Sequence, residues 1–433
     1  MATHPRAHFP AARSGATAPR ESPSLRYRTV RQTSLEIAAA LEIEDQVVQS
    51  MPDVSPTKWH LGHTSWFFEE FLLGPRVPGY RPFDERFGYL FNSYYESVGP
   101  RHARPCRGLL TRPTLREVLR YRAHVDEHMT RLVENIETDS EVWPLVELGL
   151  NHEQQHQELM LTDLKHVLSC NPLEPAYRSD LEPSATAGAA TPMGWIAFGE
   201  GLREIGTDGE AAFCFDNETP RHREWLEAFE LADRLVTNAE YLEFIRAGGY
   251  RQPTLWLSDG WSVVQQQHWS HPLYWSDDLA TEFTLAGRRS LDPAAPVCHL
   301  SYFEADAFAR WAAARLPTEA EWETAAAGLP VEGNLMDRDA LRPLPAAAGT
   351  GLRQMFGDVW EWTRSPYGPY PGFRPAAGAI GEYNGKFMCS QFVLRGGSCA
   401  TPADHIRPGY RNFFYPHSRW QFTGLRLARD LGS

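Results

Sequence analysis

The spacing of apolar residues in the first 170 positions follows a helical period rather than the alternation of a strand. Ser55 as N-cap with Pro56 at the first helical position marks the start of one helix. The capping box Thr114-x-x-Glu117 marks the start of another. Helices are expected over residues 29–49, 55–73, 114–136 and 140–168. Four amphipathic helices of this length predict a helical bundle.

The remaining pattern predicts a second domain of a different kind. Residues 182–192 are small, polar and rich in helix breakers, which is typical of a linker. The chain beyond is dense in Gly, Pro and Trp, with brief helical patterns at 238–247, 301–314 and 318–327, and predicts an irregular α+β domain. The predicted organisation is a mobile tail over 1–24, a helical domain over 25–181, the linker, and a second domain over 193–433.

The long connection between the second and third helices, residues 74–113, is a candidate lid. Connections of this length inside a compact domain are usually functional.

Composition and charge narrow the classes of protein. The 433 residues suffice for two or three domains, and 42% hydrophobic with 22% charged residues is typical of globular proteins. A formal net charge of −13 disfavours nucleic acid and anionic membranes as partners. No stretch approaches 18 apolar residues and the N-terminus lacks the apolar core of a secretory signal, so we expect a cytoplasmic protein. The six cysteines lie far apart and are expected to be reduced, without a zinc ribbon.

Histidine spacing provides the first candidate chemistry. Pairs at i, i+4 occur at positions 4/8, 124/128 and 152/156. At about 100° per residue, His152 and His156 fall on the apolar stripe of their helix, whereas the pair at 124/128 falls opposite the apolar stripe and should face solvent. His63 lies within the inner stripe of the second helix, with His60 at its margin. Three inward histidines predict a metal site; satisfied core histidines are the alternative.

The same segment allows a peptidase interpretation. His152-Glu153-x-x-His156 matches the zinc-protease signature, with Glu153 as general base and Glu174 or Glu182 as third ligand. The third inward histidine and the large Trp-rich second domain argue against it. Three polar residues flank the histidine face: Glu153, Gln155 and Asp163. They are either hydrogen-bond partners of the metal ligands or side chains that face solvent or pair along the helix.

Several motifs resemble a known family. Residues 59–64 (WHLGHT) and 152–158 (HEQQHQE) resemble the DinB-like domain of the ergothioneine-biosynthesis sulfoxide synthases. Residues 315–323, 357–363, 394–398 and 424–426 resemble the formylglycine-generating-enzyme fold. The resemblance covers nearly the whole chain after the tail. It implies a multi-domain α and α+β protein, in which a DinB-like four-helix bundle precedes an irregular C-type-lectin-like α+β domain.

The resemblance also implies a reaction. A mononuclear non-haem Fe(II) would be held by His63, His152 and His156, and the enzyme would use O₂ to join a thiol sulfur to C2 of the imidazole of hercynine (Nα-trimethylhistidine) as a sulfoxide. L-cysteine as the thiol would give hercynylcysteine sulfoxide. Three neutral imidazoles leave three coordination positions, enough for thiolate, substrate imidazole and O₂.

The resemblance bears on the proton donor and the thiol. Residues 92–96 (NSYYE) resemble the branch that takes free cysteine, in which two adjacent tyrosines supply the catalytic proton. We therefore expect Tyr95 to be the proton donor, with Tyr94 assisting it. The branch that uses γ-glutamylcysteine carries its tyrosine upstream of the L-R-G-G-S strand, and residues 373–380 contain none. γ-Glutamylcysteine remains the alternative thiol.

The remaining substrate contacts are also implied. Residues 411–416 resemble the betaine-binding loop, in which Asn412 would contact hercynine and Phe413 and Phe414 would line the trimethylammonium pocket. Gln155 would hydrogen-bond the substrate imidazole. Arg101 and Arg104 are candidates for the carboxylate of the thiol.

Three alternatives differ from this reaction. Ovothiol-type synthesis at C5 usually comes with a C-terminal methyltransferase. Formylglycine generation needs a cysteine pair, whereas here Cys399 follows the Arg395–Ser398 motif alone. A metal-holding binding module without a reaction is the third alternative.

Overall fold

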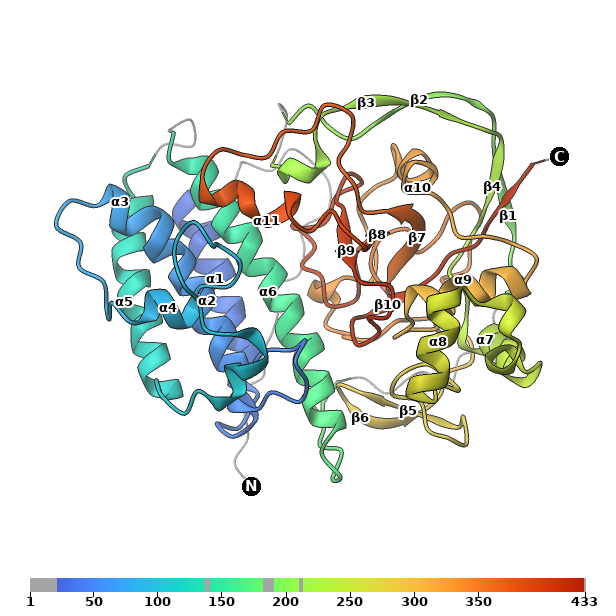
Figure 1. Ribbon diagram of the computed structural model, residues 1–433, viewed down its shortest axis with the longest axis horizontal. Helices are drawn as coiled ribbons and strands as arrows, with labels where there is room; N and C mark the ends of the chain where they lie inside the picture. The colour runs from blue at the N-terminus through green and yellow to red at the C-terminus, as the bar shows by residue number, and fades with distance from the viewer. Residues whose placement is uncertain (1–21, 137–140, 182–190, 210–212, 432–433) are drawn as a thin grey trace. The chain divides into compact units, whose positions relative to one another are not determined.

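The chain forms two compact units. The computed structural model describes residues 22–136, 141–181, 191–209 and 213–431 (Figure 1). The first unit comprises Met1–Tyr177 together with Ala376–Tyr383, and the second comprises Arg178–Pro375 and Asn384–Ser433. The tail predicted over 1–24 and the linker predicted over 182–192 lie almost entirely outside the described residues, and the predicted boundaries at 181 and 193 stay predictions.

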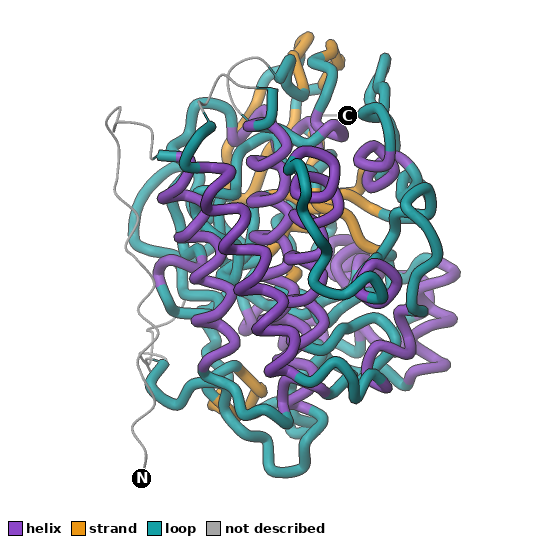
Figure 2. Tube along the Cα trace, turned by 90° about the vertical axis from the view of Figure 1, so that its left-hand side faces the viewer, coloured by secondary structure: helices purple, strands orange, loops and turns teal. Residues whose placement is uncertain are grey.

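The first unit is the predicted helical bundle. Helix α1 packs against α6 and α5, and α2 packs against α5 and α6. The four helices therefore enclose one core. The long helices run side by side in Figure 2. Their bounds are α1 (Pro23–Ala39), α2 (Thr57–Phe68), α5 (Leu115–Val133) and α6 (Trp143–Ser169).

The helix ends follow local capping chemistry. The capping box of Thr114 and Glu117 is present as predicted. Pro56, rather than Ser55, is the N-cap of α2, and that helix continues through a π-helical turn at Glu69–Leu73. The prediction for the first helix was displaced, because Ser22 caps it and it ends at Ala39.

The connection over 74–113 is an ordered layer with short helices α3 (Gly74–Arg76) and α4 (Phe87–Phe91) and a 3-10 turn, Arg104–Leu109. It packs on α2, where Trp59 Nε1 donates to the carbonyl of Leu90 at 3.0 Å. Gly62 permits this contact, since a Cβ at that position would lie 2.3 Å from the Phe91 ring. Whether the layer acts as a lid stays a prediction.

The second unit is an irregular α+β domain, as predicted. A four-stranded sheet has the order β10-β7-β8-β9, with β10 parallel to β7 and the other pairs antiparallel, and a three-stranded sheet has the order β1-β4-β11. Two ribbons, β2-β3 and β5-β6, complete the strands. The strands are β1 (Trp195–Phe198), β2 (Gly201–Ile205), β3 (His222–Leu226), β4 (Phe229–Ala232), β5 (Thr281–Thr284), β6 (Gly287–Ser290), β7 (Trp360–Pro366), β8 (Phe392–Arg395), β9 (Asn412–Phe414), β10 (Thr423–Gly424) and β11 (Ala428–Asp430).

Three helices of this unit match the predicted patterns, and α8 was not predicted. The helices are α7 (Asn238–Arg246), α8 (Ser258–Gln267), α9 (Tyr302–Trp311) and α10 (Glu319–Ala326), followed by the short α11 (Glu382–Gly385), which spans the boundary between the units.

The motifs of the second unit hold its core together. Glu361 pairs with Arg426 at 2.9 Å, and Glu319 accepts from both Arg395 and Arg411. Gly396 has a φ of +95°, and a Cβ there would lie 2.7 Å from the carbonyl oxygen of Met355. These motifs are therefore explained by buried ion pairs and a close backbone approach.

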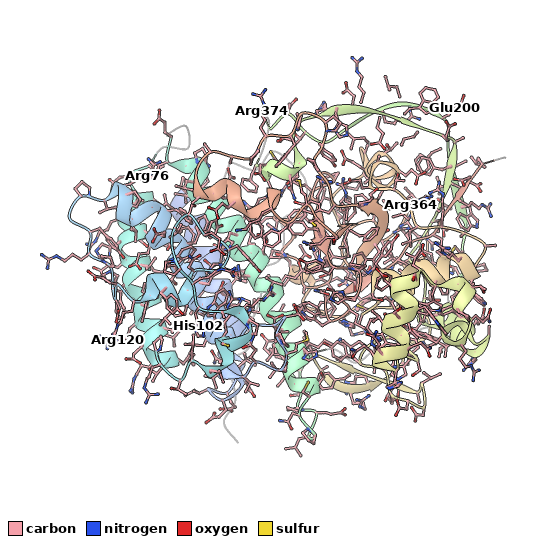
Figure 3. The ribbon with its side chains drawn as sticks, viewed as in Figure 1. Arg76, His102, Arg120, Glu200, Arg364 and Arg374 are labelled. Atoms are coloured by element: carbon pink, nitrogen blue, oxygen red, sulfur yellow. The ribbon has the colours of Figure 1, made fainter. Side chains whose placement is uncertain are left out.

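Exposed charges lie on both units. Arg76 and Arg120 of the first unit and Glu200 and Arg364 of the second have exposed side chains (Figure 3). None of the six cysteines forms a disulfide in this structure, and their reduced state stays a prediction. Within the described residues, no helix has the length and apolarity needed to cross a membrane.

Candidate metal centre

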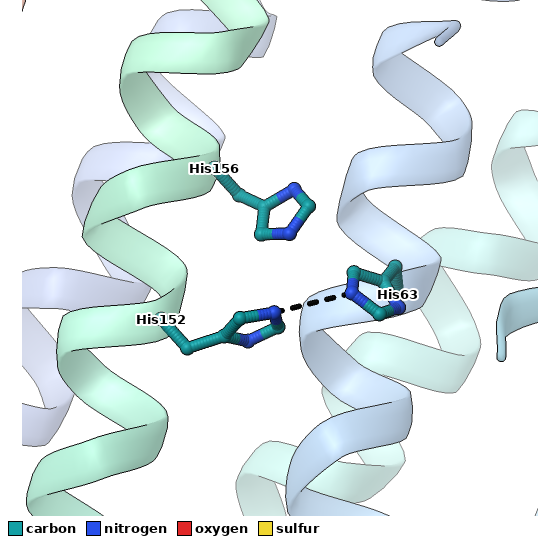
Figure 4. Close-up of side chains that lie close together, drawn as sticks. All are labelled: His63, His152 and His156. Carbon is teal, nitrogen blue, oxygen red and sulfur yellow. Dashed lines mark hydrogen bonds between the residues drawn. The ribbon is translucent and has the colours of Figure 1, made fainter. Parts of the chain in front are cut away.

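Three histidines from two helices converge in the first unit. His63 of α2 and His152 and His156 of α6 each offer one ring nitrogen, and these nitrogens lie within 4.8 Å of one another (Figure 4). All three side chains are buried. The Nε2 atoms of His63 and His152 are 3.1 Å apart. The predicted inward convergence is confirmed; the role as metal ligands stays a prediction.

The hydrogen bonds and burial suit these rings to metal binding. His63 Nδ1 lies 2.6 Å from the carbonyl oxygen of Phe91, which can only accept, so this nitrogen carries the proton and Nε2 keeps its lone pair. Burial lowers the pKa of His152 to about 4 and holds the pKa values of His63 and His156 well below their usual range. Neutral imidazoles are the form that coordinates a metal.

Aromatic rings fix the orientation of His63. Its ring stacks on Trp59, with centroids 4.6 Å apart, and on Trp66, with centroids 5.5 Å apart, both at an interplanar angle of 15°. The ring of Trp66 in turn packs against the ring of Tyr95, with centroids 5.6 Å apart. Stacking of this kind restricts the ring rotation of a ligand.

Glu153 does not take part in the histidine cluster. Its Oε1 accepts from Ser34 and Arg122, and its Oε2 accepts from Arg31 at 2.9 Å. Burial raises the pKa of this carboxyl, but the guanidinium groups of Arg122 and Arg31 outweigh it and lower the pKa to about 2. Because both carboxylate oxygens are bonded to guanidinium or hydroxyl groups, the structure does not support Glu153 as a general base.

The proposed third ligands of a peptidase are also not supported. Glu174 is absent from the cluster of ligand atoms, which is completed by His63, and Glu182 lies outside the described residues. Gln155 lies half-buried on α6 next to His156.

The other described histidine pair faces solvent only in part. His124 and His128 are half-buried, and both rings pack against Tyr80, with centroids 5.7 and 5.1 Å away. The prediction of a solvent-facing pair missed the layer over 74–113, which covers this side of α5.

Tyr94 and Tyr95, in the layer over 74–113, have opposite electrostatic environments. Burial would raise the pKa of Tyr94, but Arg104 and Arg107 outweigh it and lower the pKa below its usual value. Burial raises the pKa of Tyr95, and the nearby Tyr383 adds to this effect. Tyr94 is therefore the stronger acid of the two.

A third tyrosine belongs to this unit. Tyr383 lies with its ring centroid 5.9 Å from that of Tyr94. Its neighbour Glu382 accepts from the backbone N–H groups of Glu96 and Ser97 at 2.8 and 2.9 Å, which ties this segment to the tyrosine loop. Tyr383 lies beyond the stretch 373–380 in which a tyrosine was sought, and only its contact with the loop distinguishes it from other aromatic residues.

Three arginines line the same layer. Arg101 pairs with Glu96 at 2.8 Å, and Arg104 donates to the hydroxyl of Tyr94 at 3.1 Å. Arg107, which the sequence analysis did not select, is buried and donates to Ser55 and Ser93. Arg107 lies in a short 3-10 turn. Such a turn is too short for the spacing of apolar residues to predict which side chains are buried.

The predicted hercynine contacts belong to the second unit. Asn412, Phe413 and Phe414 form β9. The Phe413 ring stacks on Tyr367, with centroids 4.0 Å apart, whereas the ring centroids of Phe414 and Trp420 are 6.3 Å apart. Because neighbouring residues of a strand point to opposite faces, Asn412 shares a face with Phe414 and not with Phe413. That Asn412, Phe413 and Phe414 contact hercynine stays a prediction.

Comparisons with known proteins agree with both units. The DinB superfamily matches residues 26–160, and the Sulfatase-modifying factor enzyme 1-like domain matches residues 181–343 and 338–431. Hercynine oxygenase from Mycolicibacterium thermoresistibile is 34% identical over 88% of this chain and 88% of its own length. Hercynine oxygenase from Mycobacterium tuberculosis is 32% identical over 88% of this chain and 92% of its own. Ergothioneine biosynthesis protein 1 from Schizosaccharomyces pombe is 28% identical over 52% of this chain and 28% of its own. The chain therefore belongs to the hercynine oxygenase family.

Proposed function

We propose that this protein is an Fe(II)- and O₂-dependent sulfoxide synthase that joins the sulfur of L-cysteine to C2 of the hercynine imidazole. The observation that carries the proposal is the convergence of three buried, neutral histidines in a chain of the hercynine oxygenase family. The product would be hercynylcysteine sulfoxide, an intermediate on the way to ergothioneine.

The donor set fits a metal ion with open coordination positions. His63, His152 and His156 would hold it through three nitrogens, and no carboxylate is among the clustered ligand atoms. Iron would supply the reaction with O₂. A neutral donor set leaves the ion's full positive charge to attract a thiolate.

The lid tyrosines would supply a proton at their phenol oxygens. We expected Tyr95 to lead with Tyr94 assisting, but the lowered pKa of Tyr94 favours Tyr94 as the donor. The hydrogen bond from Arg104 to the Tyr94 hydroxyl would stabilise the phenolate left behind.

The arginines would bind the carboxylate of the thiol substrate. Arg101 and Arg104 were predicted for this role, and we add Arg107, whose cationic side chain donates only to neutral hydroxyls among the described residues. Asn412 would contact hercynine and Phe413 and Phe414 would line its trimethylammonium pocket, as the resemblance implies, and Gln155 would hydrogen-bond its imidazole.

The choice of thiol decides between two versions of the proposal. The adjacent tyrosines favour cysteine, whereas Tyr383 beside Tyr94 supports γ-glutamylcysteine as the second candidate. Synthesis at C5 stays an alternative to the C2 chemistry, and a cytoplasmic location stays a prediction.

The test is anaerobic loading with Fe(II), followed by aerobic mixing with hercynine and either thiol, while O₂ uptake and product mass are recorded. A sulfoxide adduct from cysteine, with its C2 attachment established by NMR, is expected. An adduct only from γ-glutamylcysteine would overturn the choice of thiol. Metal binding without thiol-dependent O₂ uptake would favour a binding module, and zinc-dependent peptide cleavage would favour the peptidase.

A further inference from the structure

His60 links one of the three clustered histidines to a carboxylate. It lies on α2, three residues before His63, and its side chain is 2% exposed. Its Nδ1 lies 2.8 Å from Nδ1 of His156, and its Nε2 lies 3.1 Å from Oδ2 of Asp163. Both ring nitrogens of His60 are therefore engaged.

The contacts among Asp163, His60 and His156 show which ring nitrogen of each histidine carries a proton. Oδ2 of Asp163 already accepts from the backbone N–H of Ser55 at 2.8 Å, so it also acts as acceptor toward His60, and His60 Nε2 must donate. In a neutral imidazole the other nitrogen is then an acceptor. His60 Nδ1 thus accepts a proton from His156 Nδ1, and His156 Nε2 keeps its lone pair.

The spacing explains why an intermediate imidazole is needed. Asp163 lies seven residues after His156 on α6, two turns along the same face, which is about 10 Å along the helix axis. Its carboxylate therefore lies too far along the axis to contact His156, and His60 from α2 spans the gap. By contrast, His63 is fixed directly by the Phe91 carbonyl.

We propose that His60 and Asp163 are positioning residues that hold His156 in the tautomer whose Nε2 binds the metal. The inference rests on the metal site of the proposed function and adds two residues to it. Partners of this kind orient a metal-ligating imidazole and make it a better donor.

Two variants of His60 separate this role from packing. In His60→Asn the amide oxygen can occupy the position of Nδ1 and accept from His156, whereas in His60→Gln the amide reaches the position of Nε2 and leaves His156 without its acceptor. We expect His60→Gln to weaken Co(II) binding by about 10- to 100-fold and to alter the Co(II) absorption spectrum, and His60→Asn to restore both toward wild type. Thermal unfolding of the metal-free proteins provides the folding control.

A measurement on the wild-type protein avoids any dependence on variant folding. With ¹⁵N-labelled histidine and bound Zn(II), NMR should show His156 protonated at Nδ1 and coordinated through Nε2. Coordination through Nδ1, or equal Co(II) affinities and spectra for wild type and His60→Gln, would overturn the inference. A wild-type protein that binds no Co(II) would overturn the proposed metal site itself, and this inference with it.

Discussion

The guanidinium carbon of Arg107 lies 3.3 Å from the centroid of the Trp59 indole, and the same indole stacks on His63. Burial lowers the pKa of Arg107 to about 9, and no carboxylate accepts a hydrogen bond from it within the described ranges. A buried cation that makes no hydrogen bond to a carboxylate is costly, and a group with so perturbed a pKa is a candidate for binding an anion.

The first prediction concerns substrate binding by Arg107. Replacing it in Arg107→Met removes a charged donor, so we expect KM for the thiol to rise about 10- to 100-fold, the equivalent of about 1.5–3 kcal/mol, with a smaller change in kcat. Arg76→Met is the matched control, because the Arg76 side chain is exposed and has no proposed role in substrate binding. Steady-state kinetics at saturating hercynine check this. A change in kcat alone would assign Arg107 to the chemical step.

The second prediction concerns the proton donor. The lowered pKa of Tyr94 leads us to expect that Tyr94→Phe reduces sulfoxide formation by about 10²-fold or more, and Tyr95→Phe by less. O₂ uptake should continue in Tyr94→Phe with cysteine sulfinate as the product. Mass spectrometry of the products decides, with Tyr383→Phe run in parallel. The reverse order of losses would restore Tyr95 as the donor.

The third prediction concerns the buried carboxylate of Glu153. Glu153→Gln leaves Arg31 and Arg122 without their shared counter-ion and should cost about 3–5 kcal/mol of the free energy of unfolding. Glu147→Gln on the same helix should cost at most about 1 kcal/mol, since the pair of Glu147 with Arg26 is partly exposed. Denaturant unfolding of the metal-free proteins measures both.

The lowered pKa of Glu153 also sets a pH dependence. Its pKa in the folded protein is about 2, below the ordinary value of 4.5, so its stabilising contribution is complete above pH 4.5 and is lost as the pH falls toward 2. The difference in unfolding free energy between wild type and Glu153→Gln should therefore shrink over that range. A constant difference would mean that the carboxylate charge contributes nothing to the effect.

The fourth prediction concerns Gly62. A methyl group in Gly62→Ala would collide with the Phe91 ring and displace the carbonyl that holds His63. We expect weaker Co(II) binding and a lower melting temperature. The double variant Gly62→Ala/Phe91→Ala should recover part of the Co(II) affinity, because the smaller side chain relieves the collision. Equal affinities in the single and double variants would show that the ring does not transmit the effect.

Sequence alone determined the helical bundle, the α+β second domain and the inward histidines, because these depend on periodicity and local capping. His152 and His156 are one turn apart on one helix, and His63 falls on the inner stripe of another, so helical geometry brings them to a common core. The motifs that contain Glu361 and Arg426 were found by their resemblance to a known family, and the pairing of these two residues is seen only in the structure.

Roles that depend on distant partners became visible only when the chain was folded. Glu153 fits the zinc-protease signature in the sequence, yet Arg31 and Arg122 from other helices occupy its oxygens. Tyr383 reaches Tyr94 from nearly 290 positions away, and Arg107 is revealed by its burial against Trp59. A spacing rule describes one helix or strand at a time, whereas the charge and acidity of a side chain are set by the groups packed around it.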